Sequence, residues 1–383
     1  MSQDVNEMKG QWIGRYTGSH EGGIIVNIDD LQNFYQGTVY LNEDDVNLPS
    51  IALFFRTKDK ARSFTISESE LAIMPIDRRT RTTNRWENVK EFYPKVESLA
   101  KKAEVKGDFD NTSLKLFWST DNGLNGSCVL EKSKANQPSE LASINDIKNW
   151  KKFKEFVAEL SPRPFLFRGQ NKPWRLRTSF HRAGRADINR FVNEDIQGLL
   201  KHISARTRHV FNLDLPNENG AFFNLVQHHG YPTPLMDWTY SPFVAAFFAY
   251  RGININHIEN DEDSSNCVRI YMFDQAAWKS DWEQILMLST NALHLSIGEF
   301  LAIENERMIP QQAVSTITNI DDIETYVINK HPDKKEYLRA IDLPIHERPQ
   351  VYRELSLMGI TAGSLFPGLD GACEELKERN FEI

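Results

Sequence analysis

The chain has 383 residues, of which 40% are hydrophobic and 26% charged, and its formal net charge is −8 at pH 7. This length and composition predict two or three globular domains, each with a core of its own. The acidic balance argues against a protein that holds nucleic acid through an overall basic surface. No stretch of about 18 apolar residues occurs, which argues against a membrane-spanning helix.

Two further features bear on location and on metal binding. The first nine residues carry acids and no apolar run, so we expect no signal peptide and a cytoplasmic protein. The cysteines Cys128, Cys267 and Cys373 are far apart and form no C-x-x-C pair. We therefore expect free thiols, neither a zinc ribbon nor a disulfide framework, and no metal site.

Residues 8–133 are expected to form a β-rich accessory domain, a small antiparallel barrel or a sandwich. Short β-branched or aromatic runs recur there between polar turns, a spacing that is typical of such folds. The runs cover residues 12–16, 24–28, 38–41, 51–55, 63–66, 105–108, 114–118 and 127–130. One helix is expected within this domain, over residues 87–103. The polar residues 134–143 are the expected linker.

Residues 144–383 mix both periodicities and are expected to form one α+β domain. Helices are expected over residues 147–160 with Asn145 as the cap, and over 187–208, 243–250, 326–341 and 348–357. Strands are expected over 165–167 and 268–273. Pro242 stands where it favours the first turn of a helix.

The first candidate for a binding group is Arg168, which follows an apolar strand and precedes Gly169. Such an arginine presents a planar, permanently charged guanidinium, which suits a phosphate or a carboxylate. Residues 163–209 are rich in arginine and contain three acids, which indicates an anionic ligand such as a pyrophosphate or a nucleic acid strand. The alternatives are a structural ion pair for Arg168 and a solvated basic face.

The most unusual stretch is 227–249, whose first half crowds polar, aromatic and backbone-restricting residues. Such a mixture indicates a loop that shapes a site. His228 or His229 with Asp237 could form the His/Asp pair of a hydrolase, or could bind within the loop. Thr239 and Ser241 stand before the Pro242 helix, where a hydroxyl can orient a ribose or phosphate, or can cap the helix.

A third cluster occupies residues 304–312. Glu304 or Glu306 could supply a carboxylate, and Gln311 a hydrogen-bonding substitute for one; the alternative is a polar surface turn. Aromatic residues near these clusters could form the walls of a pocket, or could belong to the core. They are Trp174, Tyr231, Trp238 and Tyr240.

In chain order these clusters resemble the FRG domain, a family named for its Phe-Arg-Gly motif. Residues 167–170, Phe-Arg-Gly-Gln, match the name, and residues 227–242 match the central block of the family. Asn305-Glu306-Arg307 with Gln311 is similar to a later block, although Gln312-Ala313 stands where the family is expected to have Gln-Gly. The resemblance extends over residues 144–376.

The same order is also similar, more weakly, to the motifs of ADP-ribosyltransferases: a strand-end Arg-Gly, a strand ending in Thr-x-Ser before an Ala/Phe-rich helix, and a late Glu or Gln. The likeness implies an ADP-ribosyltransferase-like fold for the second domain, with NAD as the co-substrate. It implies that Arg168 holds the dinucleotide and that Thr239 or Ser241 braces the nicotinamide ribose. Glu304, Glu306 or Gln311 would direct the transfer.

The residues expected around NAD are Arg168, Gly169, Gln170, His228, His229, Tyr231, Asp237, Trp238 and Tyr240. The acceptor would be a nucleic acid or a protein, as for a toxin or defence effector, and a regulatory protein is an expected partner. Two other functions stay open from the residues: a nucleotide-binding or nucleic-acid-binding module without catalysis, and the His/Asp hydrolase.

Overall fold

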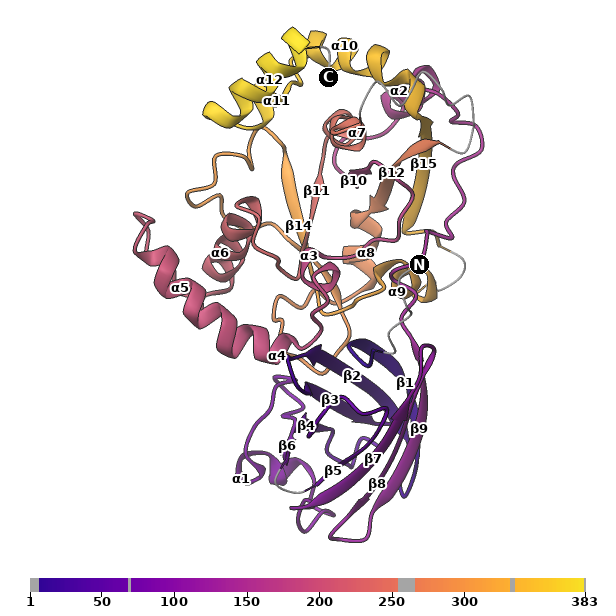
Figure 1. Ribbon diagram of the computed structural model, residues 1–383, viewed down its shortest axis with the longest axis vertical. Helices are drawn as coiled ribbons and strands as arrows, with labels where there is room; N and C mark the ends of the chain where they lie inside the picture. Colours follow the sequence, from indigo (N-terminus) through magenta and orange to yellow (C-terminus); the bar gives the residue numbers. More distant parts are fainter. Residues whose placement is uncertain (1–6, 68–69, 254–265, 331–334, 382–383) are drawn as a thin grey trace.

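The computed structural model describes residues 7–67, 70–253, 266–330 and 335–381. Its strands fall into two antiparallel sheets, which follow one another along the long axis of the molecule (Figure 1). Within these ranges no helix is long and apolar enough to cross a membrane.

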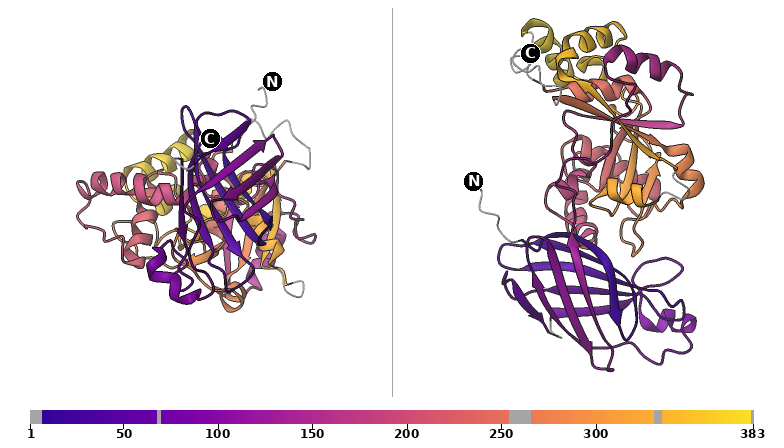
Figure 2. Two further views of the ribbon diagram at one scale, coloured as in Figure 1. Left: turned by 90° about the horizontal axis from the view of Figure 1, so that it is seen from below. Right: turned by 90° about the vertical axis from the view of Figure 1, so that its right-hand side faces the viewer.

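The first sheet, here called the N-terminal sheet, has the strand order β5-β7-β8-β9-β1-β2-β3-β4-β6. Its strands are β1 (Gly10–Gly18), β2 (Gly22–Asp30), β3 (Tyr35–Glu43), β4 (Ile51–Arg56), β5 (Ser63–Ile66), β6 (Leu71–Pro75), β7 (Ala103–Phe109), β8 (Ser113–Thr120) and β9 (Asn125–Lys132). The sheet is strongly curved (Figure 2), so side chains of distant strands, such as Val26 and Leu114, share one core on its concave face.

The prediction of a β-rich antiparallel N-terminal part is confirmed as one large antiparallel sheet, and each expected run lies within a strand. The strand β6 was not predicted. The expected helix over residues 87–103 is wrong: α1 (Trp86–Val89) and the 3-10 turn η2 (Lys90–Phe92) are all that forms. Pro94 explains the early end, because it has no amide hydrogen to donate and disfavours helical geometry in Tyr93 before it.

The second sheet, here called the C-terminal sheet, has the order β13-β14-β11-β10-β12-β15. Its strands are β10 (Phe165–Gln170), β11 (Leu235–Thr239), β12 (Cys267–Asp274), β13 (Leu295–Gly298), β14 (Ala313–Thr318) and β15 (Leu338–Pro344). The α+β character predicted for this part is confirmed.

Helices cover the C-terminal sheet and extend beyond it. They are α2 (Trp150–Ala158), α3 (Ser179–Arg182), α4 (Ile188–Arg190), the π-helical turn η3 (Phe191–Asp195), α5 (Ile196–Ser204), α6 (Pro216–His228), α7 (Pro242–Tyr250), α8 (Gln275–Asp281), α9 (Ile323–Asn329), the 3-10 turn η6 (Ile345–Glu347), α10 (Arg348–Leu357), α11 (Ala362–Leu365) and α12 (Leu369–Phe381).

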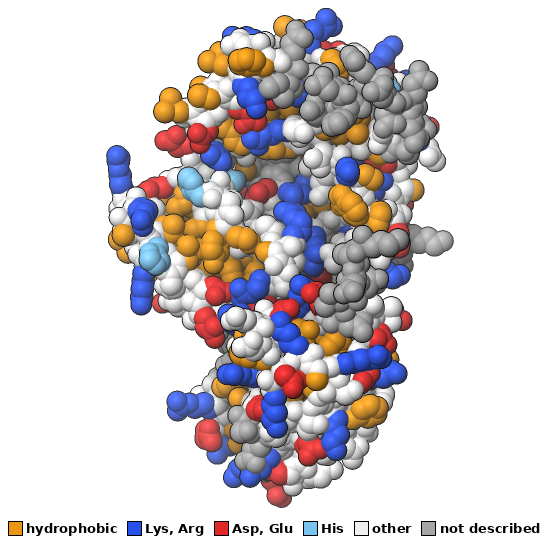
Figure 3. Space-filling model, in the orientation of Figure 1, with side chains coloured by type: hydrophobic (Ala, Val, Ile, Leu, Met, Phe, Trp, Pro, Cys, Tyr) orange, Lys and Arg blue, Asp and Glu red, His pale blue; other side chains and the backbone are white. Residues whose placement is uncertain are grey.

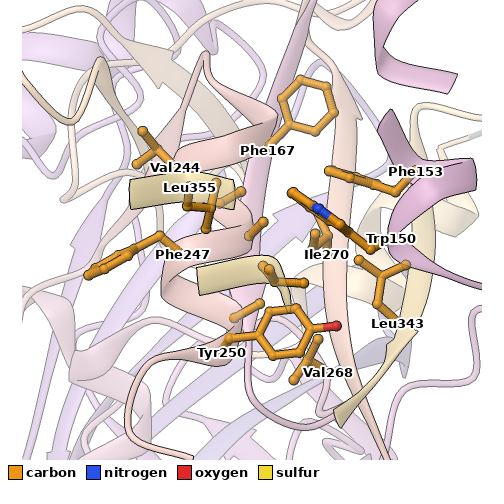
Figure 4. Close-up of a cluster of buried hydrophobic side chains, with 14 of the residues drawn as sticks. Trp150, Phe153, Phe167, Val244, Phe247, Tyr250, Val268, Ile270, Leu343 and Leu355 are labelled. Atoms are coloured by element: carbon orange, nitrogen blue, oxygen red, sulfur yellow. The ribbon is translucent and has the colours of Figure 1, made fainter. Parts of the chain in front are cut away.

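The helix α7 is the centre of the packing on one face of this sheet. Val244 and Phe247 of α7 meet Phe167 of β10 and Ile270 of β12, and α2 and α10 close the cluster from outside (Figure 4). Burying one such side chain stabilises the fold by about 1.5–3 kcal/mol. The strand β10 is therefore firmly held next to Arg168. On the opposite face, α8 and α9 pack on Trp238 and its neighbours.

The helices expected over 243–250 and 348–357 match α7 and α10, and the one over 187–208 runs from α4 to α5. The helix over 326–341 matches α9 at residues 326–329 but is wrong at its end, because residues 338–341 belong to β15; residues 331–334 of that prediction lie outside the described part. The cap of α2 is Asn149, whose side chain accepts from Lys152 N, and not Asn145. The helix α6 replaces the loop expected at Gln227 and His228.

The outer face of β2 and β3 contacts residues 185–190, the segment that leads into α4. Asp29, which is fully buried, accepts from Arg185 Nε at 2.6 Å and from the backbone nitrogens of Ala186 and Asp187. Asp187 in turn accepts from Thr38 Oγ1 at 2.9 Å. Charged, multiply bonded groups therefore hold this contact, and the concave face of the N-terminal sheet stays free of it.

Candidate functional site

The Phe-Arg-Gly sequence of β10 is explained by the helix that packs on it. Phe167 and Gly169 share the face that meets α7, and Arg168 between them faces the other way. A Cβ atom at residue 169 would lie 1.9 Å from the backbone oxygen of Ala245. Glycine is thus required for the close approach of α7, and the motif sets Arg168 between two fixed neighbours.

Arg168 lies where the sheet begins to open. The strand β10 pairs with β12 along six positions, 165 to 170, but with β11 only at Phe167 and Thr239. Beyond that pair, Arg168 Nη1 donates to the backbone oxygen of Asp237 at 2.6 Å. A guanidinium therefore takes the place of a strand-to-strand bond, and part of the role of Arg168 is to bridge the split.

The charge of Arg168 is incompletely compensated. Its Nε is buried without a hydrogen-bond partner, and no carboxylate of the described residues forms an ion pair with it. Burial, and then the positive charge of Arg182, lowers the pKa of Arg168 to about 10. The group remains a cation at pH 7, and a bound anion would relieve both effects.

Arg182 of α3 is the residue that the sequence interpretation missed. Its Nη1 donates to the backbone oxygen of Arg177 at 2.7 Å, and burial followed by the charge of Arg177 lowers its pKa. Arg177 itself pairs with Asp321. The high density of arginine in residues 163–209 was the available signal, but it could not separate the paired Arg177 from the others.

Asp237 is oriented by the end of α6. Its Oδ1 accepts from Gln227 Nε2, and Gln227 Oε1 accepts from the hydroxyl of Thr233. His228 does not bond to Asp237; its Nδ1 accepts from Asn305 Nδ2 at 2.5 Å. The geometry of the described residues therefore contains no His–Asp pair here, and His229 is exposed at the end of the helix.

The two hydroxyls between β11 and α7 take part in internal bonds. Thr239 is buried, and its Oγ1 donates to the backbone oxygen of Gln311 at 2.7 Å. The same Oγ1 accepts from Ser241 N at 3.0 Å. Ser241 Oγ caps α7 by accepting from Val244 N at 3.2 Å. Both hydroxyls thus hold the β11–α7 corner in this conformation.

The residues 304–312 form a turn that leads into β14, and we call them the 304–312 turn. Because β14 pairs with β11, with Thr239 opposite Ala313, the turn lies at the Thr239 end of β11. Gln311 is buried and its Nε2 donates to the backbone oxygen of Leu365 at 2.9 Å. Glu306 is exposed, and Glu304 accepts from His209 N at 2.6 Å.

This turn is strained and tightly held. Glu304 and Gln312 have φ angles of 51° and 47°, a left-handed conformation that costs a side-chain-bearing residue roughly 1–2 kcal/mol. Arg307 Nη1 donates to the backbone oxygen of His228 at 2.9 Å, which fixes the turn to the end of α6. Backbone strain that the surrounding bonds maintain is frequent at binding sites.

The aromatic candidates are divided between core and surface. Trp238 is buried in the core, and its Nε1 donates to Thr316 Oγ1 at 3.1 Å. Tyr231 and Tyr240 are half-buried, and the guanidinium of Arg163 lies over the ring of Tyr240 at 5.0 Å. Trp174 is 49% exposed, and its backbone oxygen accepts from Gln170 Nε2.

The structure thus places Arg168, Asp237, Thr239 and Gln311 on or beside the adjacent strands β10, β11 and β14, with Thr239 on the Phe167 face of the sheet and Arg168 on the opposite face. The side chains of His229 and Glu304 are exposed at the end of α6 and in the 304–312 turn, and Trp238, on the same face of the sheet as Arg168, is buried in the core. Figure 3 shows a hollow in the surface of the C-terminal part, with basic, acidic and hydrophobic side chains along its walls. Such a surface can hold an anion at its basic wall and a flat, apolar group beside it.

Comparison with known families agrees with the motif. Residues 163–257 match the family model of the FRG domain, a range that contains Arg168, the end of α6, β11 and α7 but not the 304–312 turn. No curated protein and no solved structure matches the chain significantly. The chain therefore contains an FRG domain, in which Arg168 is the arginine of the name-giving motif.

Proposed function

We propose that the FRG domain is an ADP-ribosyltransferase that takes NAD as its co-substrate and modifies a nucleic acid or a protein. One observation carries the proposal. The three motif positions, Arg168, Thr239 and Gln311, come from segments far apart in the chain and lie on or next to the neighbouring strands β10, β11 and β14. This adjacency of strands is what the weak likeness to ADP-ribosyltransferases requires, and it supports an ADP-ribosyltransferase-like fold, with Arg168 on the face of the sheet opposite Thr239.

The role of Arg168 in this proposal is to bind the pyrophosphate. Its guanidinium is a cation without a carboxylate partner in the described part of the chain, and Arg182 adds a second charge nearby. A pyrophosphate would accept the donors that the protein leaves unused and would neutralise the mutual repulsion of the two arginines.

The reaction itself would exchange two bonds at one ribose carbon. The bond from C1′ to nicotinamide breaks and nicotinamide leaves with the electron pair, while a nucleophile of the acceptor bonds to C1′ and loses its proton. The transition state resembles an oxocarbenium ion, as in glycoside chemistry. Polar groups at the 304–312 turn, where Glu306 is exposed, would stabilise that positive charge, and Thr239 would fix the corner that positions it.

The test is to incubate the full chain with labelled NAD and with nucleic acid or protein acceptors. We expect release of nicotinamide and a labelled acceptor. Arg168→Ala should lower the rate of nicotinamide release at least 100-fold. Arg168→Lys should restore little of this rate, because the point charge of lysine does not replace the planar pair of donors of arginine. The exposed Arg206, whose side chain donates to the backbone oxygen of His202, supplies the control Arg206→Ala. Failure to release nicotinamide with any acceptor contradicts the proposal.

A second function, binding of a nucleotide or nucleic acid without turnover, is favoured by one specific observation. The second position before β14 carries the amide of Gln311, whose Nε2 is already bonded to the backbone oxygen of Leu365. No carboxylate stands at that position. Tight binding of NAD or of single-stranded nucleic acid that weakens in salt, without nicotinamide release, would establish this function instead.

The His/Asp hydrolase receives no support from the geometry. His228 is bonded to Asn305 and Asp237 to Gln227, so no base is set against a nucleophile there. Within the described ranges, no three His, Cys, Asp or Glu side chains gather as a metal site would require.

A further inference from the structure

A cavity of about 300 Å³ lies on the concave face of the N-terminal sheet. Every residue that lines it falls between 16 and 125, so the cavity belongs to this sheet and is separate from the Arg168 site. Leu41, Leu53, Val105 and Trp118 make its wall apolar, and the same four residues border the apolar interior deeper in the sheet. Asn122 and Asn125 are exposed at its edge, so it opens to solvent.

The segment 95–100 closes one side of this cavity. It contains neither helix nor strand. Its half-buried residues Val96, Leu99 and Ala100 line the cavity. A cavity of this size is within the range of sites for small molecules. Its apolar walls require a ligand with an apolar body, because a polar body would lose its bonds to water without replacement.

One acidic group interrupts the apolar lining. Tyr16, Gly22 and Glu43 stand opposite one another on β1, β2 and β3, and therefore share the concave face. Gly22 has no side chain, so the Tyr16 ring, 3.1 Å from where a Cβ of residue 22 would lie, extends towards Glu43. The side chain of Glu43 is 9% exposed, and its Oε2 has no hydrogen-bond partner in the described residues.

The surroundings of Glu43 leave its charge only partly compensated. Its Oε1 lies 3.5 Å from His20 Nδ1. The buried hydroxyl of Tyr16 is close enough to oppose the effect of burial on the Glu43 pKa, but it forms no hydrogen bond of standard geometry within the described residues. Burial raises the pKa of the Glu43 carboxyl, and it also raises the pKa of the Tyr16 hydroxyl, which therefore stays protonated. Lys95 is exposed at the edge, where solvent screens its charge.

We propose that this cavity binds a small amphipathic amine, with its apolar body against Leu41, Leu53, Val105 and Trp118 and its ammonium head on Glu43. The ammonium supplies the donors that Oε2 lacks and the charge that a buried carboxylate needs. The rings of Tyr16 and Trp118, in edge contact at 5.6 Å, provide aromatic surface that favours a cation. This binding function is independent of the function proposed for the FRG domain.

The test compares three ligands of equal chain length that differ only in the head: octylamine, octan-1-ol and octanoate. The full chain is titrated with each by calorimetry below the concentration at which the ligand aggregates. We expect octylamine to bind at least tenfold more tightly than octan-1-ol, and octanoate to bind most weakly because its carboxylate meets Glu43. Absence of binding by all three, or equal or tighter binding of octanol or octanoate, overturns the proposal.

Variants then assign the site. Glu43→Gln keeps the shape and should weaken octylamine binding at least tenfold while leaving octan-1-ol unchanged. Ala103→Phe fills the cavity and should abolish both. The control is Glu104→Gln on the same strand, where the carboxylate is exposed and paired with Lys106, and binding should not change. If Glu43→Gln binds octylamine as tightly as the unaltered chain, the assignment of the head group is wrong, whether or not Ala103→Phe folds.

Discussion

The two sheets of this molecule use their apolar faces in opposite ways. On the C-terminal sheet, α7 packs so closely that residue 169 has no room for a side chain. On the concave face of the N-terminal sheet, no helix enters and a cavity of about 300 Å³ remains. The face that α7 covers leaves room for a binding site only at its edge, where β10 and β11 separate beside Arg168. A hollow face can hold a ligand within itself.

The difference also separates the two kinds of recognition that the buried charges allow. Arg168 has the charge of Arg182 near it, and Arg182 has that of Arg177, so charge density would select the ligand there. Glu43 lies in an apolar wall, so a ligand must first bring a matching apolar body. Interactions with a charge are stronger where the surroundings are less polar, and one head group can therefore decide binding in the cavity.

The largest effect on stability is expected when one methyl group is added to each sheet and the two losses in the free energy of unfolding are compared. In Gly169→Ala, the new Cβ would lie 1.9 Å from Ala245 O and 2.6 Å from Ala249 N, both backbone atoms of α7. In Gly14→Ala, it would lie 2.6 Å from the Leu130 Cδ2 atom alone, the end of a flexible side chain. We expect Gly169→Ala to lower the free energy of unfolding by about 3 kcal/mol or more, and Gly14→Ala to lower it by less than about 1 kcal/mol.

Urea unfolding followed by circular dichroism measures both variants, and Gly198→Ala on α5 serves as the control. Nothing lies within 4 Å of a Cβ at residue 198, so that change should stabilise the helix by about 0.5–1 kcal/mol. Equal losses for Gly169→Ala and Gly14→Ala would show that the two faces are packed alike, against the contrast drawn above.

The sequence predicted the N-terminal sheet better than the helices of the C-terminal part, for a physical reason. Strands exposed on one face alternate apolar and polar residues, and this period of two is visible within five residues. The helix predicted over 326–341 was wrong at its end because an apolar run that enters a buried strand, here β15, has no such period. The helix α6 was missed because Gln227 and His228 at its end resembled a loop.

The site shows what sequence order can and cannot provide. The order of Arg168, Thr239 and Gln311 indicated three segments, and their convergence follows from strand pairing, which joins residues far apart in the chain. No pattern in the sequence shows that the hydroxyl of Thr239 bonds to the Gln311 backbone. The row of Tyr16, Gly22 and Glu43 was not predicted either, since it depends on the register of three strands.

The second prediction concerns the contact of the N-terminal sheet with residues 185–190. Burial, and then the negative charge of Asp29, raises the pKa of Asp187 to about 6, with the Arg185 cation and the Thr38 hydroxyl acting against the shift. A raised carboxyl pKa means that the folded state holds the proton more tightly than the unfolded state. Below about pH 4, this proton contributes about 3 kcal/mol to the free energy of unfolding. The contribution is lost as the pH rises through 6.

The variant Asp187→Asn should remove this loss. We expect its free energy of unfolding to equal that of the unaltered chain near pH 4 and to exceed it at pH 7 by up to about 3 kcal/mol. The bond to Thr38 is kept, because the Oδ1 of asparagine can still accept from the Thr38 hydroxyl. Urea unfolding at several pH values measures it, with the exposed Asp108→Asn as the control. A variant that is less stable than the unaltered chain at pH 7 would show that folding does not raise the pKa of Asp187.

The smallest effect is expected at the border of the filled face, in the 304–312 turn. Gln312 has a φ of 47° and its side chain is exposed, while its backbone oxygen accepts from Tyr240 N at 3.1 Å. Gln312→Gly removes the left-handed penalty but adds freedom to the unfolded chain, so we expect a net gain of about 0.5–1 kcal/mol in the free energy of unfolding. Gln312→Ala keeps the penalty and should gain nothing.

Thermal unfolding of Gln312→Gly and Gln312→Ala measures that gain, and nicotinamide release measures whether the strain serves the site. If strain at residue 312 holds the turn in the geometry needed for transfer, Gln312→Gly should be more stable than Gln312→Ala and yet slower. If the glycine variant is both more stable and equally active, the strain has no part in the site and the bonds of Arg307 and Gln311 alone position the turn. A glycine variant less stable than the alanine variant would contradict the left-handed conformation itself.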